Sequence, residues 1–236
     1  MDRFFGRIDA GVAEISGEEF HHLFKVMRKR VGDRVGVFDG RREFVGEIAE
    51  ISPREGRAVV RLNRELPPML PPVHITVAVS PPKGGRLDEL ISRLVEIGVS
   101  AIVPMLCERT VRRPKKRKDR WGRIVLSAVK QSRRTDIPEV LPPMSLPDVL
   151  EAFGDYEGKF AGLIGSETPL VRLEPRPRNV ILIGPEGDFT PREREMILKA
   201  GFVGFSMGKI ILRVETAAMV SAACLLQKAW ANAPSS

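Results

Sequence analysis

Three short segments place glycines and carboxylates directly after runs of apolar residues. They read GLIGSET (162–168), IGPEGDF (183–189) and SMGKIILRVETAA (206–218). A glycine-rich turn between a strand and a helix often binds phosphate, because its amides and the helix dipole attract anions. Here no Lys-Ser/Thr pair follows the glycines, no GxGxxG is present, and Glu186 and Asp188 would repel a phosphate. The chemistry therefore favours a neutral or cationic ligand, such as a ribose or purine edge or a positive centre.

We expect the three segments to share one pocket, because ligands of parallel sheets bind where the strands end. The second segment alone also fits an ordinary strand-to-helix turn, and Arg213 and Glu215 in the third could form only a surface ion pair. The recurrence of glycine and carboxylate at three strand ends favours the shared pocket. Thr190, Pro191 and Glu193 are predicted to start a helix instead, as a T-x-x-E capping box with proline at the first helical position.

Positive charge is concentrated in one part of the chain. The net charge is +8, yet residues 108–134 alone carry 12 basic and 2 acidic residues. A dense basic segment of this kind is typical of proteins that bind a polyanion. A solvated loop without a partner is the alternative interpretation.

The composition bounds the class of protein. The chain has 236 residues, 43% of them hydrophobic, which is typical of a folded soluble protein. No run reaches the length of a membrane span, and the N-terminus lacks the apolar core of a signal peptide. Cys107 and Cys224 are far apart and the three histidines show no zinc spacing, so we expect a cytoplasmic protein without a metal.

Residues 1–70 are predicted to form a small β-rich domain. Ser16 and Glu19 form an S-x-x-E pattern that predicts a capped helix ending near Gly32. Asp39-Gly40 between two β-rich runs predicts a hairpin, and residues 57–62 read as a further strand. Four prolines in 65–72 then interrupt regular structure, so we place the domain boundary there.

Residues 73–236 are predicted to form an α/β domain. Strands that are apolar throughout alternate with helices, which indicates a parallel sheet covered on both faces. The predicted strands are 74–80, 100–106, 159–165, 179–184 and 203–208. The predicted helices are 86–98, which ends at Gly98, a basic helix at 119–134 with Trp121, Ile124, Val125 and Ala128 inward, and 215–229.

Several motifs together resemble one known family. IGPEG (183–187) and GKIILRVETA (208–217) are the most specific of them. Supporting motifs are Arg3-Phe4-Phe5, the segment from His22 to Arg28, Gly32-Asp33, KGGRLD (83–88), VEIG (95–98) and QSRR (131–134) before Ile137-Pro138. The chain resembles the ribosomal RNA uridine-N3 methyltransferases of the RsmE type, within the SPOUT superfamily. It departs from the family pattern at Arg93, at Lys209-Ile210 and at Lys130, where an acidic residue is usual.

The resemblance implies a SPOUT-type parallel-sheet domain with a trefoil knot, preceded by a small PUA-like β-barrel domain. It also implies a homodimer and a pocket for S-adenosylmethionine. The residues that it assigns to the cofactor are Leu163, Gly165, Glu167, Gly184, Pro185, Glu186, Gly187, Met207, Gly208, Ile210, Ile211, Leu212, Thr216 and Ala217.

The implied reaction is methylation of N3 of a uridine in 16S ribosomal RNA of the small subunit. Arg213 is the candidate to stabilise the deprotonated uridine, and Glu215 the candidate to orient Arg213. Candidate RNA contacts are Arg3, His22, Arg28, Lys29, Arg30, Lys83, Arg109, Arg112, Arg113, Lys115, Lys116, Arg117, Lys118, Gln131 and Arg134. A related enzyme acting on another RNA or on a ribose hydroxyl, or a non-catalytic RNA-binding assembly protein, remain the alternatives.

Overall fold

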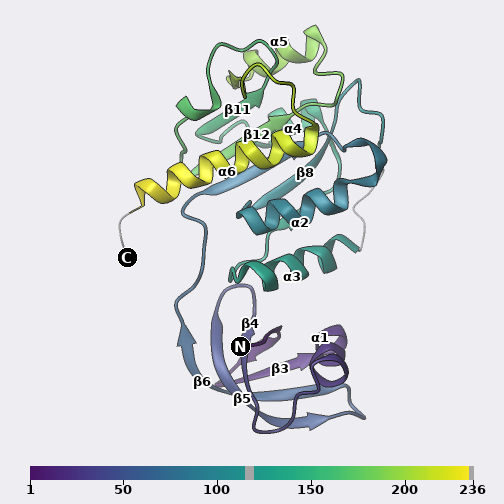
Figure 1. Ribbon diagram of the computed structural model, residues 1–236, viewed down its shortest axis with the longest axis vertical. Helices are drawn as coiled ribbons and strands as arrows, with labels where there is room; N and C mark the ends of the chain where they lie inside the picture. The colour runs from purple at the N-terminus through teal and green to yellow at the C-terminus, as the bar shows by residue number, and fades with distance from the viewer. Residues whose placement is uncertain (115–119, 234–236) are drawn as a thin grey trace. The chain divides into compact units, whose positions relative to one another are not determined.

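The chain divides into two compact units (Figure 1). The computed structural model describes residues 1–114 and 120–233. The first unit combines Met1–Leu70 with Val129–Ile137, and the second holds the remaining described residues. Segment 129–137 lies outside the range 1–70 that the sequence predicts for the small domain, because a contact made so late in the chain leaves no local pattern.

Six strands form the sheet of the first unit. They are β1 (Arg3–Phe5), β2 (Arg7–Asp9), β3 (Val12–Ser16), β4 (Arg34–Phe38), β5 (Glu43–Ser52) and β6 (Arg57–Leu66). Their order is β1-β4-β5-β6-β3-β2, so β1 and β2 lie at its two ends. Only Gly6 separates these strands in the chain, so the two ends meet and the sheet curls into a barrel. A β-carbon on Gly6 would lie 2.8 Å from the carbonyl oxygen of Glu14, so this closure requires glycine.

The predicted hairpin at Asp39-Gly40 is confirmed. β4 and β5 pair antiparallel, with Phe38 opposite Glu43. The Asp39 carboxylate accepts hydrogen bonds from the backbone N–H groups of Arg41 and Arg42, at 2.9 and 2.8 Å. Gly40 takes a φ of 92°, which is a conformation that glycine adopts without strain. This turn is local, which explains why its sequence was sufficient to predict it.

The helix after β3 is shorter than the sequence predicts. α1 (Gly17–His21) continues as a π-helical turn over His22–Val26. Arg28 then takes a left-handed φ of 53°, so the helix ends well before Gly32.

The capping box predicted at Ser16 is wrong. Ser16 occupies the N-cap position but its side chain accepts no capping hydrogen bond. Glu19, the other half of the pattern, accepts the N–H of Phe5 at 3.0 Å and forms an ion pair with Lys130 at 2.9 Å. These partners come from other parts of the chain, and together they replace the local cap.

The second unit contains the parallel sheet that the apolar runs predict. Its strands are β7 (His74–Val79), β8 (Ala101–Leu106), β9 (Glu139–Val140), β10 (Met144–Ser145), β11 (Gly158–Gly162), β12 (Arg178–Ile183) and β13 (Val203–Phe205). Their order is β10-β8-β7-β12-β11-β13, with β9 also paired to β8, and every pairing is parallel. The two-residue strands β9 and β10 are too short to give a sequence pattern.

Helices cover both faces of this sheet (Figure 1). They are α2 (Leu87–Ile97), α4 (Leu146–Ala152), α5 (Pro191–Lys199) and α6 (Val214–Asn232). A further helix, α3 (Arg120–Ser132), is linked to α2 by a hydrogen bond from Trp121 to Asp88. α4 and α5 contribute to one buried cluster with Ala78, Val180 and Leu182. Neighbouring strand residues point to the opposite face, where α6 contacts β7 and β12 and also contacts α2.

The predicted end of α2 and most of the predicted inward face of α3 are confirmed. α2 stops at Gly98, whose φ is 114°, as a helix with a glycine C-terminus does. On α3, Trp121, Val125 and Ala128 are buried as predicted, whereas Ile124 is only partly buried. The indole N–H of Trp121 donates to Asp88 at 3.0 Å.

Candidate active site

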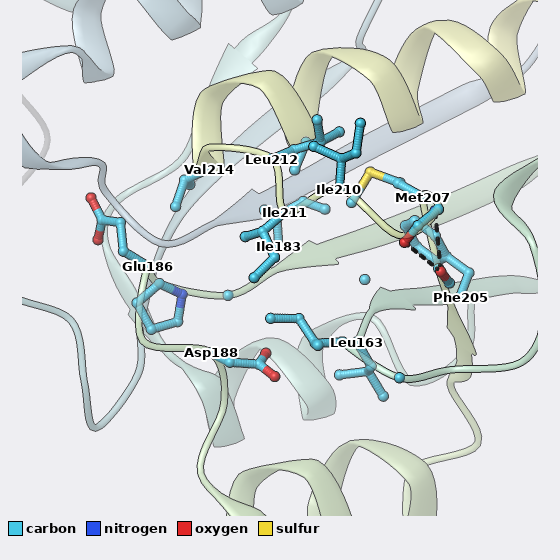
Figure 2. Close-up of a pocket in the computed structure, with 18 of the residues that line it drawn as sticks. Leu163, Ile183, Glu186, Asp188, Phe205, Met207, Ile210, Ile211, Leu212 and Val214 are labelled. Carbon is cyan, nitrogen blue, oxygen red and sulfur yellow. Dashed lines mark hydrogen bonds between the residues drawn. The ribbon is translucent and has the colours of Figure 1, made fainter.

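Three neighbouring strands end at one edge of the sheet and release the three glycine-containing segments side by side. β11 pairs in parallel with both β12 and β13, so the loops that follow them leave the sheet together. They enclose a pocket (Figure 2). Its lining is mostly backbone and aliphatic side chains: Gly162, Leu163, Ile164, Gly165, Ile183, Gly184, Pro185, Glu186, Asp188, Phe205, Ser206, Met207, Gly208, Lys209, Ile210, Ile211, Leu212, Val214 and Ala217.

The loop after β12 forms a tight turn over a buried ring. The N–H of Asp188 donates to the carbonyl oxygen of Pro185 at 2.9 Å, and Asp188 takes a φ of 58°. A β-carbon on Gly184 would lie 2.8 Å from the ring of Phe189, which is itself only 5% exposed. Glycine at 184 is therefore required by packing, which lets the backbone approach the pocket closely.

Two segments from elsewhere in the chain hold this turn from outside. The Glu186 carboxylate accepts the backbone N–H of Lys83 at 3.1 Å. The Arg109 guanidinium donates to the carbonyl oxygen of Gly187 at 2.5 Å. In Figure 2 the Glu186 carboxylate points away from the aliphatic side chains at the pocket centre, in agreement with its bond to Lys83.

The predicted helix start at Thr190 is confirmed. Thr190 Oγ1 accepts the N–H of Glu193 at 3.3 Å, and the Glu193 carboxylate accepts the N–H of Thr190 at 2.9 Å. The other Glu193 oxygen accepts the N–H of Glu108 at 2.8 Å, although the sequence gives no sign of this link. Burial, together with the charge of Glu193, raises the pKa of the Cys107 thiol to about 12. Cys107 therefore stays protonated and is not a nucleophile.

The loop after β11 presents backbone groups to the pocket. Gly165 takes a φ of 80°, and the N–H of Ser166 turns back to the carbonyl oxygen of Leu163 at 3.1 Å. Arg194 Nη1 donates to the carbonyl oxygen of Ile164 at 2.9 Å. Within the described residues, the N–H groups of Ile164 and Gly165 have no hydrogen-bond partner.

The loop after β13 closes the pocket with exposed aliphatic side chains. The N–H of Gly208 donates to Ser206 Oγ at 3.2 Å, and Gly208 takes a φ of 104°. Ile210 and Ile211 are 80% and 78% exposed, which is high for residues of this type. No partner for the N–H groups of Ile210 and Leu212 is found in the described part of the chain.

This lining fits the nucleoside half of S-adenosylmethionine. Leu163, Ile183 and Ile211 converge from three elements in Figure 2 and offer apolar surface to a flat purine ring. The unpartnered backbone N–H groups of the first and third loops can bind its polar edge. The carboxylate of Asp188 also lines the pocket and suits a ligand that carries a positive centre.

Most of the residues predicted for the cofactor lie in this lining. These are Leu163, Gly165, Gly184, Pro185, Glu186, Met207, Gly208, Ile210, Ile211, Leu212 and Ala217. Three do not line it, namely Glu167, Gly187 and Thr216.

Other lining residues were missed by the sequence reasoning. They are Gly162, Ile164, Ile183, Asp188, Phe205, Ser206, Lys209 and Val214. Ile183 and Phe205 end apolar strands and read as core residues, so no sequence signal separates them from their neighbours. Asp188 could have been included, since it directly follows the predicted cofactor residues Glu186 and Gly187 and precedes the helix cap at Thr190.

The predicted pairing of Glu215 with Arg213 is not present. Glu215 forms its ion pair with Arg86, at 2.7 Å. Arg213 precedes α6 at the N-cap position and is exposed, and no described residue forms an ion pair with it. Arg213 nevertheless lies between the lining residues Leu212 and Val214, so it remains at the rim of the pocket.

Two of the predicted RNA contacts are buried in the first unit. Arg3 forms a two-pronged ion pair with Glu43, with both distances 2.8 Å, and its side chain is 7% exposed. It also donates to the carbonyl oxygens of Val129 and Arg134. Arg134 is 5% exposed at its side chain and is paired with Asp136 at 2.6 Å. We therefore expect Arg3 and Arg134 to hold segment 129–137 in place and not to contact RNA.

The other predicted RNA contacts differ in their exposure and in the partners that they bind within the protein. Arg28, Arg30, Gln131, Lys83, Arg109, Arg112 and Arg113 are exposed, while His22 and Lys29 are partly exposed. Lys29 pairs with Asp2 at 2.7 Å, which lowers the pKa of that carboxyl group. Arg113 donates to the carbonyl oxygens of Cys107, Glu108 and Thr110 and so stabilises its own loop. Lys115, Lys116, Arg117 and Lys118 lie outside the described residues.

Within residues 1–114 and 120–233, no cluster of side chains could hold a metal ion. In the same part of the chain, no helix is both long and apolar enough to cross a membrane.

Comparison with known proteins decides the family. The family described as RNA methyltransferase domain matches residues 69–226, and the RNA methyltransferase PUA domain matches residues 15–61. Ribosomal RNA small subunit methyltransferase E of Bacillus subtilis is 30% identical over 92% of this chain and 93% of its own length. This chain belongs to that family. The resemblance read from the motifs is therefore confirmed, as is the fold class of a SPOUT-type domain with a PUA-like domain.

Two solved structures support the comparison. Ribosomal RNA small subunit methyltransferase E from Neisseria gonorrhoeae, bound to S-adenosyl methionine, is 30% identical with a TM-score of 0.87, covering 96% of this chain and 97% of its own. A methyltransferase from Legionella pneumophila in complex with the same cofactor is 27% identical with a TM-score of 0.81, covering 96% and 97%.

Proposed function

We propose that the protein transfers a methyl group from S-adenosylmethionine to N3 of a uridine in 16S ribosomal RNA of the small subunit. The observation that carries the proposal is the three-loop pocket, whose aliphatic walls and unpartnered backbone N–H groups fit an adenosine with a positive centre. Membership of the methyltransferase E family supports the same reaction, since two relatives were solved with this cofactor bound.

The chain's own residues have two tasks in this reaction. S-adenosylmethionine, when bound, supplies an electrophilic methyl group. The pocket loops hold the cofactor through backbone N–H groups and the side chains of Leu163, Ile183 and Ile211. The uridine N3 must lose its imide proton to solvent before its lone pair can attack the methyl group, so a cation at the rim favours the reactive anion. Arg213 is exposed there, and no residue of 1–114 or 120–233 forms an ion pair with it, so we assign this role to it.

The exposed basic residues support RNA as the substrate. Arg28, Lys29 and Arg30 in the first unit and Lys83, Arg109 and Arg112 in the second are candidate phosphate contacts. Phosphate contacts give affinity without sequence choice, so recognition of a folded RNA shape would select the target. The homodimer, the trefoil knot and the cytoplasmic location that accompany this function stay predictions.

Two measurements test the proposal. Calorimetry with S-adenosylmethionine should show binding to the purified protein, and absence of heat at millimolar ligand would exclude the enzyme in favour of an RNA-binding assembly protein. Mass spectrometry of RNA from a deletion strain should then show one unmethylated uridine N3 in 16S RNA. A missing ribose methyl group, or a change in another RNA, would establish the alternative substrate instead.

A further inference from the structure

Two carboxylates from the cofactor side of the second unit hold one short basic segment. The segment is KGGR, residues 83–86, in which Gly84 and Gly85 take φ values of 73° and 78°. Glu186 accepts the backbone N–H of Lys83 at its first residue, and Glu215 pairs with Arg86 at its last. Glu186 lines the cofactor pocket, and Glu215 lies in the first turn of α6 directly after the lining residue Val214. The KGGR segment is therefore fixed beside the pocket at both ends.

The Arg86–Glu215 pair leaves much of the guanidinium available. Only Nη1 of Arg86 contacts Glu215, and the Arg86 side chain is 45% exposed whereas that of Glu215 is 18% exposed. A guanidinium has five N–H donors in a planar fork that matches the oxygens of a phosphate. An ion pair with so exposed a partner adds little to stability, so folding alone gives weak reason for it.

The charges around the KGGR segment favour an anion. Lys83 and Arg86 are exposed, and Arg112 Nη1 would lie 3.3 Å from a β-carbon on Gly85. Three cations thus surround two glycines, while each nearby carboxylate already has a partner. Glu186 and Glu215 bind the segment itself, and Asp88 pairs with Arg120.

We propose that Arg86, held by Glu215, binds an RNA phosphate next to the target nucleotide and thereby positions the base at the pocket. Arg86 is thus a further substrate-positioning residue, and Glu215 acts through it and not through Arg213. The inference rests on the proposed function, because it takes the pocket to be the cofactor site.

The test compares Arg86→Ala and Glu215→Gln with the wild type in methyl transfer to RNA. Arg86→Ala should raise the KM for RNA about tenfold, as expected for one lost charge-assisted phosphate contact. It should also reduce the salt dependence of RNA binding by about one phosphate equivalent. Glu215→Gln should raise KM in the same direction but less, and neither variant should change the Kd for S-adenosylmethionine more than about twofold, since neither residue lines the pocket.

The matched control is Arg178→Ala. Arg178 is 43% exposed and also ion-paired, but it begins β12 and so lies at the end of that strand away from the pocket. It should leave the KM for RNA unchanged. If Arg178→Ala raises KM as much as Arg86→Ala does, the assigned role of Arg86 is wrong.

Exchanging the charges of Arg86 and Glu215 distinguishes a role in positioning RNA from a role in stabilising the fold. Arg86→Glu combined with Glu215→Arg restores an ion pair but moves the cation to α6. If Arg86 positions the RNA, the exchanged protein keeps the raised KM even where its melting temperature recovers. Recovery of the KM would reduce the pair to a structural link and overturn the proposal. Failure of the wild type to bind S-adenosylmethionine would instead count against the proposed function, while RNA binding measured without cofactor still tests Arg86.

Discussion

Substituting Gly184 by alanine is the most direct test of how the pocket turn is built. The added β-carbon would lie 2.8, 3.0 and 3.1 Å from three atoms of the Phe189 ring, well inside normal contact. The ring belongs to the buried cluster with α4 and α5, so it cannot move away freely. Overpacking of this kind costs about 1–3 kcal/mol in the free energy of unfolding. For a chain of this length, each kcal/mol lowers the melting temperature by about 2–4 °C.

The backbone at 184 would yield as well, and this links stability to ligand binding. A shift of the turn misplaces Pro185 and Glu186, so the Kd for S-adenosylmethionine should rise about tenfold, the loss of one good interaction. Urea unfolding gives the stability and calorimetry the affinity. Phe189→Leu in the same chain should recover about 1 kcal/mol of the stability as a coupling term.

Gly122→Ala is the matched control, because a β-carbon there meets no atom within 4 Å and the residue lies inside α3. It should stabilise the protein by about 0.5–1 kcal/mol, as alanine does for glycine in a helix. A Gly184→Ala protein that unfolds at the wild-type urea concentration, or a double variant without coupling, would refute the contact with Phe189.

Three further predictions concern buried or partly buried groups. Glu193→Ala should lower the free energy of unfolding by about 2–4 kcal/mol in urea, because it removes a helix cap and leaves the N–H of Glu108 without a partner; a loss below about 0.5 kcal/mol, typical of surface sites, would contradict this. A thiol reagent at pH 8 should label Cys224 and spare Cys107 in the folded protein, since burial holds the pKa of Cys107 near 12, and should label both after unfolding; rapid labelling of Cys107 in the folded state would oppose its burial. Lys130→Met should destabilise the first unit by about 1–3 kcal/mol, because the Glu19 carboxylate, only 14% exposed, loses its partner, and Glu19→Gln in the same chain should recover part of the loss by thermal melting; no recovery would show that the pair is not coupled.

The same pattern succeeds at one helix start and fails at another, for a physical reason. Thr190 and Glu193 form their capping box because both groups are free to bind each other's backbone. At Ser16 the equivalent acid, Glu19, binds Lys130 and the N–H of Phe5 instead. A local pattern predicts a local contact only when no distant partner competes for the same side chain.

The candidate site shows the same division. The sequence was sufficient to place the glycines and aliphatic residues of the three loops at strand ends, because a strand ends where its run of apolar residues stops. The partner of Glu215 could not, because Arg86 lies 129 positions away in the chain. Likewise the burial of Arg3 and Arg134 depends on the return of segment 129–137 to the first unit, which no spacing reveals.

That return also sets an order of events during synthesis. Arg3 is synthesised 126 and 131 residues before Val129 and Arg134, whose carbonyl oxygens it binds. Protein synthesis adds about 5–20 residues per second, so several seconds pass between the completion of β6 and the synthesis of segment 129–137. During this interval Arg3 can already form its ion pair with Glu43, and this early contact can hold the nascent barrel closed. A fragment ending at residue 70 would be arrested permanently at this stage, with the seat of segment 129–137 open to water.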